Sequence, residues 1–148
     1  FSFGTRAPKV RPRGPHDTPG PSPSHVKDHG RMTDKINLAE KLSTFDERWS
    51  PRTVASFNGH DVMVVKVEGE FTWHAHPDTD DFFLVLKGEI DIRLRDRTVT
   101  LKAGEMFVVP KNVEHCPFAR EEAHLLLIEP AGTPNTGDPE TAARRTEI

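Results

Sequence analysis

Two histidines, His74 and His76, lie two positions apart in the short stretch FTWHAH. If that stretch is a β-strand, both side chains leave the same face, separated by about two rises of roughly 3.3 Å each. Two imidazoles at that spacing can converge on one metal ion, although such a pair in a strand is more often a surface or hydrogen-bonded pair. The pair is therefore one half of a candidate metal site.

A carboxylate, Asp81, follows at the start of the next apolar stretch, DFFLVLKG. If Asp81 points inward, strand alternation places Phe83 and Val85 inward with it. A carboxylate buried among apolar side chains is costly unless a cation offsets its charge. In the alternative interpretation, Asp80 and Asp81 are polar turn residues that cap the strand.

A third histidine, His115, ends the stretch GEMFVVPKNVEH, in which Gly104 and Pro110 mark the ends of a short strand. It is distant from His76 in sequence, but the two can be neighbours across a barrel. His124 could also reach the cavity, although a lone histidine at the start of a strand is more often structural.

Two kinds of element must position these side chains. Leu38, Leu42 and Phe45 recur at helical spacing and predict one short helix from about Asn37 to Phe45, with Thr33 or Asn37 as its cap.

From Arg52 onward the apolar residues recur at every second position, which is the spacing of β-strands. Asn58-Gly59 separates two strands and favours a type I′ hairpin. The further predicted strands are FTWHAH, DFFLVLKG, EIDIRLRD, RTVTLKAG, EMFVVP, HCPFA and HLLLIEP.

These short strands are separated by Gly, Pro, Asn and Asp residues and have almost no helix between them. That pattern indicates an all-β antiparallel sandwich or barrel. In EIDIRLRD, Ile90, Ile92 and Leu94 share one face, so one face of that strand is buried and the other is solvated.

The ends of the chain differ in composition from its centre. Residues 1–31 are basic and rich in proline, and they predict a disordered segment, which is either vector-derived or an over-called extension before a natural start at Met32. We expect residues 32–50 to form a helical lead-in, residues 51–131 the barrel, and residues 132–148 a flexible tail.

The motifs of the central stretch resemble those of the cupin superfamily. In that superfamily the first motif is His-x-His, then three or four residues, Glu, six residues and Gly; here it reads His74, His76, Asp81 and Gly88. The second motif contains Gly, five residues, Pro-x-Gly, two residues and His; here it reads Gly104, Pro110, Asn112 and His115. The resemblance implies a double-stranded β-helix, or jelly-roll barrel, with one short N-terminal helix before it.

The resemblance also implies that His74, His76, Asp81 and His115 bind one divalent metal ion. Asp81 stands where the superfamily has Glu, and its side chain reaches about 1.5 Å less, against ligand bonds of about 2.0–2.2 Å. The site is then four-ligand, water-bridged or three-histidine. Asn112 stands where the superfamily has Gly, and Asn tolerates a positive φ. The donor set suits Fe, Mn, Ni, Co or Zn, and sequence does not choose among them.

Two functions fit this sequence, and a purely structural barrel that binds no metal is the third interpretation. The first is a metal-dependent enzyme, either a dioxygenase-type oxidoreductase or an isomerase- or lyase-type enzyme, that acts on a small oxygenated molecule in the barrel. The second is a noncatalytic binding or sensing module in which the ion anchors a ligand or stabilises the barrel. The sequence names no catalytic residue beyond the ligands, and it has no tyrosine, phosphate-binding loop or serine triad.

Composition limits the partners and the location. The basic N-terminal segment lacks interleaved aromatic residues, so we expect no nucleic-acid partner, and no apolar run is long enough to cross a membrane. The single cysteine, Cys116, excludes an intrachain disulfide and fits a cytoplasmic protein.

The outward-facing side chains of Phe82, Leu84 and Leu86 are large and apolar. Another element or a second subunit must bury them, and they predict a homodimer. Trp73 should lie outside the barrel, against the helix.

Overall fold

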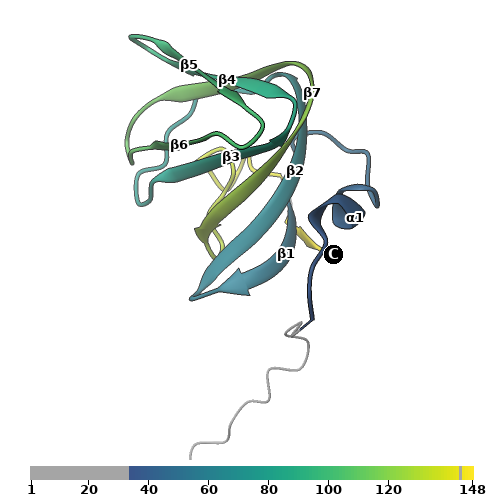
Figure 1. The fold of residues 1–148 in the computed structure, drawn as a ribbon. Helices are drawn as coiled ribbons and strands as arrows, with labels where there is room; N and C mark the ends of the chain where they lie inside the picture. Colours follow the sequence, from purple (N-terminus) through teal and green to yellow (C-terminus); the bar gives the residue numbers. More distant parts are fainter. Residues whose placement is uncertain (1–33, 144) are drawn as a thin grey trace, which may run out of the picture.

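The computed structural model describes residues 34–143 and 145–148, and most of these residues belong to β-strands that curve around one core (Figure 1). The predictions for residues 1–31 therefore lie outside the described residues. Hydrogen bonding within the described part does not close the sheet completely. The fold is the expected all-β jelly-roll barrel with one short helix.

Helix α1 (Leu38–Leu42) begins at Asn37, whose side-chain oxygen accepts a hydrogen bond from the Glu40 N–H at 3.1 Å. This confirms the predicted cap, although the helix is shorter than 37–45. Leu42 and Phe45 are buried against the outer face of the sheet, so packing stabilises a helix too short to form alone. No helix among the described residues is long and apolar enough to cross a membrane.

Strands β1 (Arg52–Phe57) and β2 (His60–Glu70) form the predicted hairpin. Asn58 and Gly59 have φ angles of 48° and 75°, which are the positive values that a type I′ turn requires. The two strands lie on the right of Figure 1, beside α1.

The other strands complete the barrel, and β7 is its central element. They are β3 (Asp81–Lys87), β4 (Glu89–Leu94), β5 (Thr98–Lys102), β6 (Met106–Val109), β7 (His115–Pro130) and β8 (Thr146–Glu147). Strand β7 pairs antiparallel with β2, β3 and β4. It is one strand where the sequence predicts two, because β2 pairs along most of its length, while β4 pairs with its first residues and β3 with residues of its second half.

Strand alternation places the core as predicted. Phe83 and Val85 of β3 and Ile90 and Ile92 of β4 are buried in the barrel. Their neighbours Phe82, Leu84 and Leu86 are only partly buried, on the outer face. The inner side of the barrel is therefore apolar, with polar side chains only where the ligand candidates enter it.

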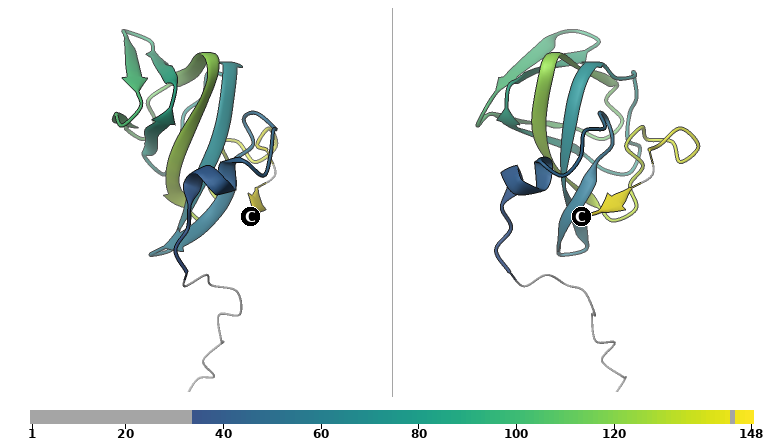
Figure 2. Two further views of the ribbon diagram at one scale, coloured as in Figure 1. Left: turned by 45° about the vertical axis from the view of Figure 1, so that its right-hand side comes forward. Right: turned by 90° about the vertical axis from the view of Figure 1, so that its right-hand side faces the viewer.

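The chain after β7 returns to the barrel. The N–H of Ala131 donates to the Gly59 carbonyl at 3.0 Å, and β8 pairs in parallel with β1. In Figure 2 this segment runs beside β1 and β2. The flexibility of residues 132–148 and the domain limits given above remain predictions.

Candidate metal centre

The four candidate ligands come from three places in the chain and meet inside the barrel. His74 and His76 lie between β2 and β3, Asp81 is the first residue of β3, and His115 is the first residue of β7. Their ligand atoms all lie within 4.8 Å of one another. The sequence therefore identifies four side chains that the fold brings together.

The segment that carries His74 and His76 is extended, but it is not the strand that FTWHAH predicts. It makes one bridge, in which His74 and His115 exchange backbone hydrogen bonds of 3.0 and 2.9 Å. The N–H of Asn112, which has a φ of 65°, donates to the His76 carbonyl at 2.8 Å. The turn before β7 and the histidine segment thus hold each other in place.

Backbone carbonyls orient two of the three imidazole rings. His74 Nδ1 lies 2.8 Å from the Thr72 carbonyl oxygen, and His115 Nδ1 lies 2.9 Å from the Val113 carbonyl oxygen. An Nδ1–H that donates to a carbonyl leaves the Nε2 lone pair free, which is the usual tautomer of a metal-binding histidine. Both Nε2 atoms face Asp81.

The third imidazole is left without hydrogen bonds. His76 is 3% exposed, and neither of its ring nitrogens has a hydrogen-bond partner among the described residues. Its Nε2 lies 3.2 Å from Asp81 Oδ2, but not in hydrogen-bond geometry. A buried, unsatisfied nitrogen is costly. A cation bound between His76 and Asp81 would satisfy it.

Asp81 reaches the other three ligands. Its Oδ2 atom lies 2.8 Å from His115 Nε2, 3.2 Å from His76 Nε2 and 3.9 Å from His74 Nε2. Neighbouring ligands with bonds of about 2.1 Å lie about 3.0–3.4 Å apart in octahedral or tetrahedral geometry. Small side-chain shifts would bring these four atoms onto one ion, so the donor set fits a divalent transition metal.

The charges of the site follow from burial and from Asp81. Burial raises the pKa of Asp81, but the imidazole nitrogens of His115 and His76, which lie 2.8 and 3.2 Å from its Oδ2, favour the ionised carboxylate and lower that pKa from 3.8 to about 2. Burial lowers the pKa of His74 from 6.5 to about 4. Burial also acts to lower the pKa of His76, but the Asp81 carboxylate outweighs it and raises that pKa. The site thus has an ionised carboxylate and a neutral His74 at neutral pH.

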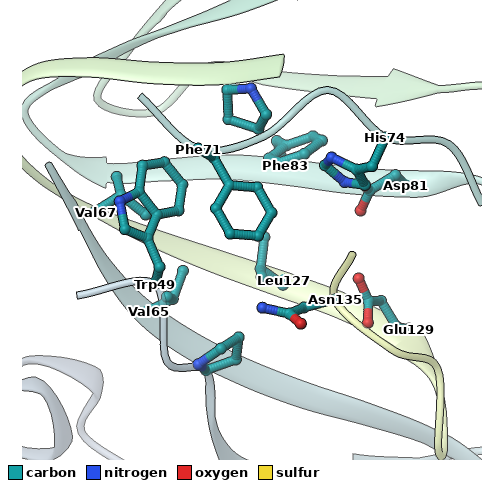
Figure 3. A pocket seen from close by; sticks show the side chains of 12 residues that line it. Trp49, Val65, Val67, Phe71, His74, Asp81, Phe83, Leu127, Glu129 and Asn135 are labelled. Carbon is teal, nitrogen blue, oxygen red and sulfur yellow. The ribbon is translucent and has the colours of Figure 1, made fainter. Parts of the chain in front are cut away.

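A cavity of about 40 Å³ opens from this centre into the barrel (Figure 3). His74, Asp81, Glu129 and Asn135 line one end of it. The rest of its wall is apolar and is formed by Trp49, Pro51, Val65, Val67, Phe71, Phe83, Pro117 and Leu127. The polar groups are thus gathered at one end, beside the candidate ligands.

Two aromatic rings form one side of the apolar wall. Trp49 and Phe71 stack with their centroids 4.8 Å apart and an angle of 20° between the rings, and Phe71 meets His74 edge-on at 5.3 Å. Trp49 has a φ of 57°, which is rare for a bulky residue. Its N–H donates to the Lys66 carbonyl and its indole N–H to the Glu68 carbonyl. These bonds hold a strained residue against the cavity.

Glu129 is a site residue that the sequence analysis misses. It is 3% exposed, and its carboxylate lies 3.2 Å from the Arg145 guanidinium. Burial, followed by the charge of Asp81, outweighs Arg145 and raises the pKa of Glu129 to about 8. The alternation Leu125, Leu127, Glu129 in HLLLIEP could have identified it as inward-facing. Glu129 therefore holds a proton beside the candidate metal centre at neutral pH.

The remaining candidates lie away from the centre. His124 lies on the outer side of β7, where its Nε2 is 3.3 Å from Glu122, so the structural interpretation holds. Trp73 lies outside the barrel as expected, but the guanidinium of Arg95 covers its ring at 3.8 Å, in place of the helix. Cys116 is fully buried, and burial raises the pKa of its thiol.

Comparisons with known proteins agree with this fold. Residues 61–129 match the family model described as a cupin domain. A cupin-2 domain containing protein from Shewanella frigidimarina has a solved structure that is 52% identical, with a TM-score of 0.64, over 64% of this chain and 93% of that one. The Bacillus subtilis protein YdbB, described as uncharacterized, is 34% identical over 57% of this chain and 75% of its own length.

A relative with a named activity is more distant. The 3-hydroxyanthranilate 3,4-dioxygenase of Brucella anthropi is 32% identical over 85 residues, which are 51% of this chain and 46% of that enzyme. The chain thus spans about half the length of this dioxygenase.

Proposed function

Because this chain belongs to the cupin superfamily, we propose that it is a metal-dependent enzyme that acts on a small oxygenated molecule, with dioxygenase-type chemistry as the first reaction to test. The proposed metal ligands are His74, His76, Asp81 and His115. The observation that carries the proposal is that these four groups converge at the polar end of an otherwise apolar cavity.

The ligand set leaves room for a substrate. Three imidazoles and one carboxylate would fill four positions of a six-coordinate ion, and such an ion, when bound, acts as a Lewis acid or as a dioxygen-binding centre. The aromatic faces of Trp49 and Phe71 suit a flat apolar body, and the polar end of the cavity suits its oxygen substituents. The activity named for the Brucella anthropi relative supports the same class.

The protein's own residues would handle the proton. Glu129, whose pKa is raised to about 8 in the metal-free protein, lies at the cavity wall as a carboxyl group that can donate a proton to a substrate oxygen. Arg145 lies behind Glu129 and would stabilise the carboxylate that remains. His74 and His115 keep their rings fixed through the Thr72 and Val113 carbonyls. The apolar wall excludes water from the reacting end.

The test is anaerobic loading with Fe(II) or Mn(II), followed by oxygen uptake measurements with a panel of small hydroxylated aromatic compounds. We expect metal to bind at one equivalent and oxygen uptake to depend on one class of substrate. The His76→Ala variant should lose both, and the matched control His124→Ala, on the outer face, should keep both. Product analysis under nitrogen covers isomerase- and lyase-type reactions.

The same experiment distinguishes an enzyme from the noncatalytic binding or sensing module. Metal binding that raises the thermal stability of the protein, without turnover of any compound in the panel, would favour a binding or sensing module. Failure of the wild-type protein to bind metal at all would contradict both functions.

We also propose that the protein is a homodimer. Helix α1 and its flanking residues cover Leu86 on the outer face, but Phe82 and Leu84 lie beside Met106 and Val108 of β6, which are 53% and 40% exposed. An apolar sheet face of this kind suits a second copy of the chain.

A further inference from the structure

The wall of the cavity includes residues that lie outside the family match. The match ends at Glu129, yet Asn135 lines the cavity beside Glu129, and Trp49 and Pro51 line it from before residue 61. The barrel supplies the four candidate ligands. The flanking segments supply part of the surface that a ligand would touch.

The segment after β7 is tied to the barrel through Arg145. We call this segment, Ala131 to Ala143 together with Arg145, the C-terminal strap. The Arg145 guanidinium contacts Asp61 of β2 at 2.5 Å, Glu129 of β7 at 3.2 Å and the Thr133 carbonyl at 2.5 Å. One cation thus joins two barrel strands to the start of the strap, and it does so with only 21% of its side chain exposed.

The strap also contacts the histidine segment directly. Gly137 has a φ of 75°, and a Cβ atom built there would overlap the carbonyl oxygen of Ala75. Ala75 lies between His74 and His76, so the strap lies against the segment that carries two candidate ligands. The close approach requires glycine at this position.

Two cavities meet at the strap. The inner cavity of about 40 Å³ is far smaller than the roughly 300 Å³ or more of ligand-binding cavities, so an organic ligand needs additional space. A second cavity of about 410 Å³ is lined by strap residues and Arg145, and it shares Pro51 and Asn135 with the inner one. Asn135 therefore lines both cavities, and it lies beside Glu129 in the wall of the inner one (Figure 3).

From this arrangement we infer that the C-terminal strap is the entrance and selectivity wall of the metal centre, and that Asn135 contacts the bound ligand. Displacement of Asn135 joins the two cavities and makes room for a small planar molecule. The Oδ1 atom of Asn135 accepts a hydrogen bond from the Ala143 N–H at 2.9 Å, so its amide NH₂ group is the part that can donate to an oxygen substituent on that molecule. The proposal that the ligand is a small planar molecule rests on the proposed function. The proposal that the C-terminal strap forms the entrance does not.

The entrance can be tested without metal or substrate. In a Trp73→Phe background, Trp49 is the only tryptophan and reports on the inner cavity. We expect Arg145→Gln to raise the acrylamide quenching constant of Trp49 at least twofold, because the strap loses its ties to Asp61 and Glu129. The control Arg120→Gln removes an exposed guanidinium and should leave the constant unchanged.

A second pair of variants guards against a folding defect at Arg145. Gly137→Ala should push the strap away from Ala75 and raise the quenching constant in the same way. Gly104→Ala is its matched control, because Gly104 also has a positive φ, of 85°, but open space around the added Cβ. Equal quenching constants in the parent, Arg145→Gln and Gly137→Ala proteins would overturn the proposal that the strap forms the entrance.

The contact with Asn135 is tested with 4-nitrocatechol as the probe, titrated into Co(II)-loaded protein and followed by absorbance. We expect Asn135→Ala to weaken probe binding about threefold to tenfold, the range of one neutral hydrogen bond, with Co(II) affinity unchanged. Equal probe affinity in both proteins would overturn the contact. If the wild-type protein binds no Co(II), the proposed function and the contact fail together, and the quenching comparison still decides the entrance.

Discussion

Asp81 stands where the motif that this chain resembles has Glu, and its shorter side chain still lies among the three histidines. Its Oδ2 atom is the common neighbour of all three Nε2 atoms. Asp81→Asn keeps the size and removes the charge, so we expect Mn(II) affinity to fall at least about tenfold. A competition titration with a chelating dye measures it.

The control for Asp81 is Asp80→Asn. Asp80 is the adjacent carboxylate, and its Oδ1 accepts a hydrogen bond from the Lys111 N–H in the neighbouring turn. This variant should bind Mn(II) with wild-type affinity. An Asp81→Asn protein that binds Mn(II) as tightly as the Asp80→Asn protein would reduce the site to three histidines.

Glu129 makes the stability of the metal-free protein depend on pH. Its pKa is about 8 in the folded protein and near 4.5 when exposed, so the folded state binds the extra proton between these values. Stability contributed by this group therefore falls as pH rises from about 4.5 to 8. We expect the melting temperature of Glu129→Gln, measured relative to that of the wild type, to rise with pH across that window and to stay constant above it. A difference that is constant from pH 5 to 9 would refute the buried proton.

The sequence identifies some site residues and misses others for physical reasons. His74, His76 and His115 are predictable because ligand types recur at motif spacing. Glu129 is predictable only from the alternation of inward- and outward-facing residues along its strand. Trp49 carries no local signal, because its place in the wall depends on a positive φ and on hydrogen bonds to β2. Asn135 depends on a loop that only the folded barrel positions.

Among the elements, the turn between β6 and β7 sets the position of His115. Asn112 adopts a φ of 65° there and donates its N–H to the His76 carbonyl. Asn112→Gly should be tolerated, whereas Asn112→Ala should lower the free energy of unfolding by about 1–2 kcal/mol, the cost of a left-handed residue. Urea unfolding of both variants measures this. Equal stabilities would show that the turn relaxes without cost.

Sequence predicts the elements well where the signal is local. Asn58-Gly59 determines its hairpin, and the alternation in β3 and β4 assigns their faces, because both depend on neighbours in the chain. The segment of His74 and His76 is different. Whether an extended segment joins a sheet depends on a partner's backbone, and here only one bridge to His115 forms. Strand β8 is likewise set by its partner β1, since its own sequence is polar.

For the whole molecule, the proposed homodimer rests on the outer face of the barrel. Leu84 of β3 pairs with Met106 of β6, and Phe82 pairs with Val108; these four side chains form an apolar strip that lies outside the cluster packed on α1. We expect light scattering at micromolar concentration to give about twice the chain mass of 16.6 kDa. Leu84→Lys should give the monomer, because a charge at the centre of the strip is costly to bury.

A matched change elsewhere separates this contact from general hydrophobicity. Phe57 is 62% exposed at the end of the β1–β2 hairpin, so Phe57→Lys removes a large exposed apolar group but leaves the strip intact. This variant should remain a dimer. A monomeric wild-type protein, or a Leu84→Lys protein that still dimerises, would show that the strip between β3 and β6 is not the interface. The candidate metal centre lies on the inner side of the same strand, at Asp81, so monomeric Leu84→Lys should keep its metal affinity if each barrel forms its own site.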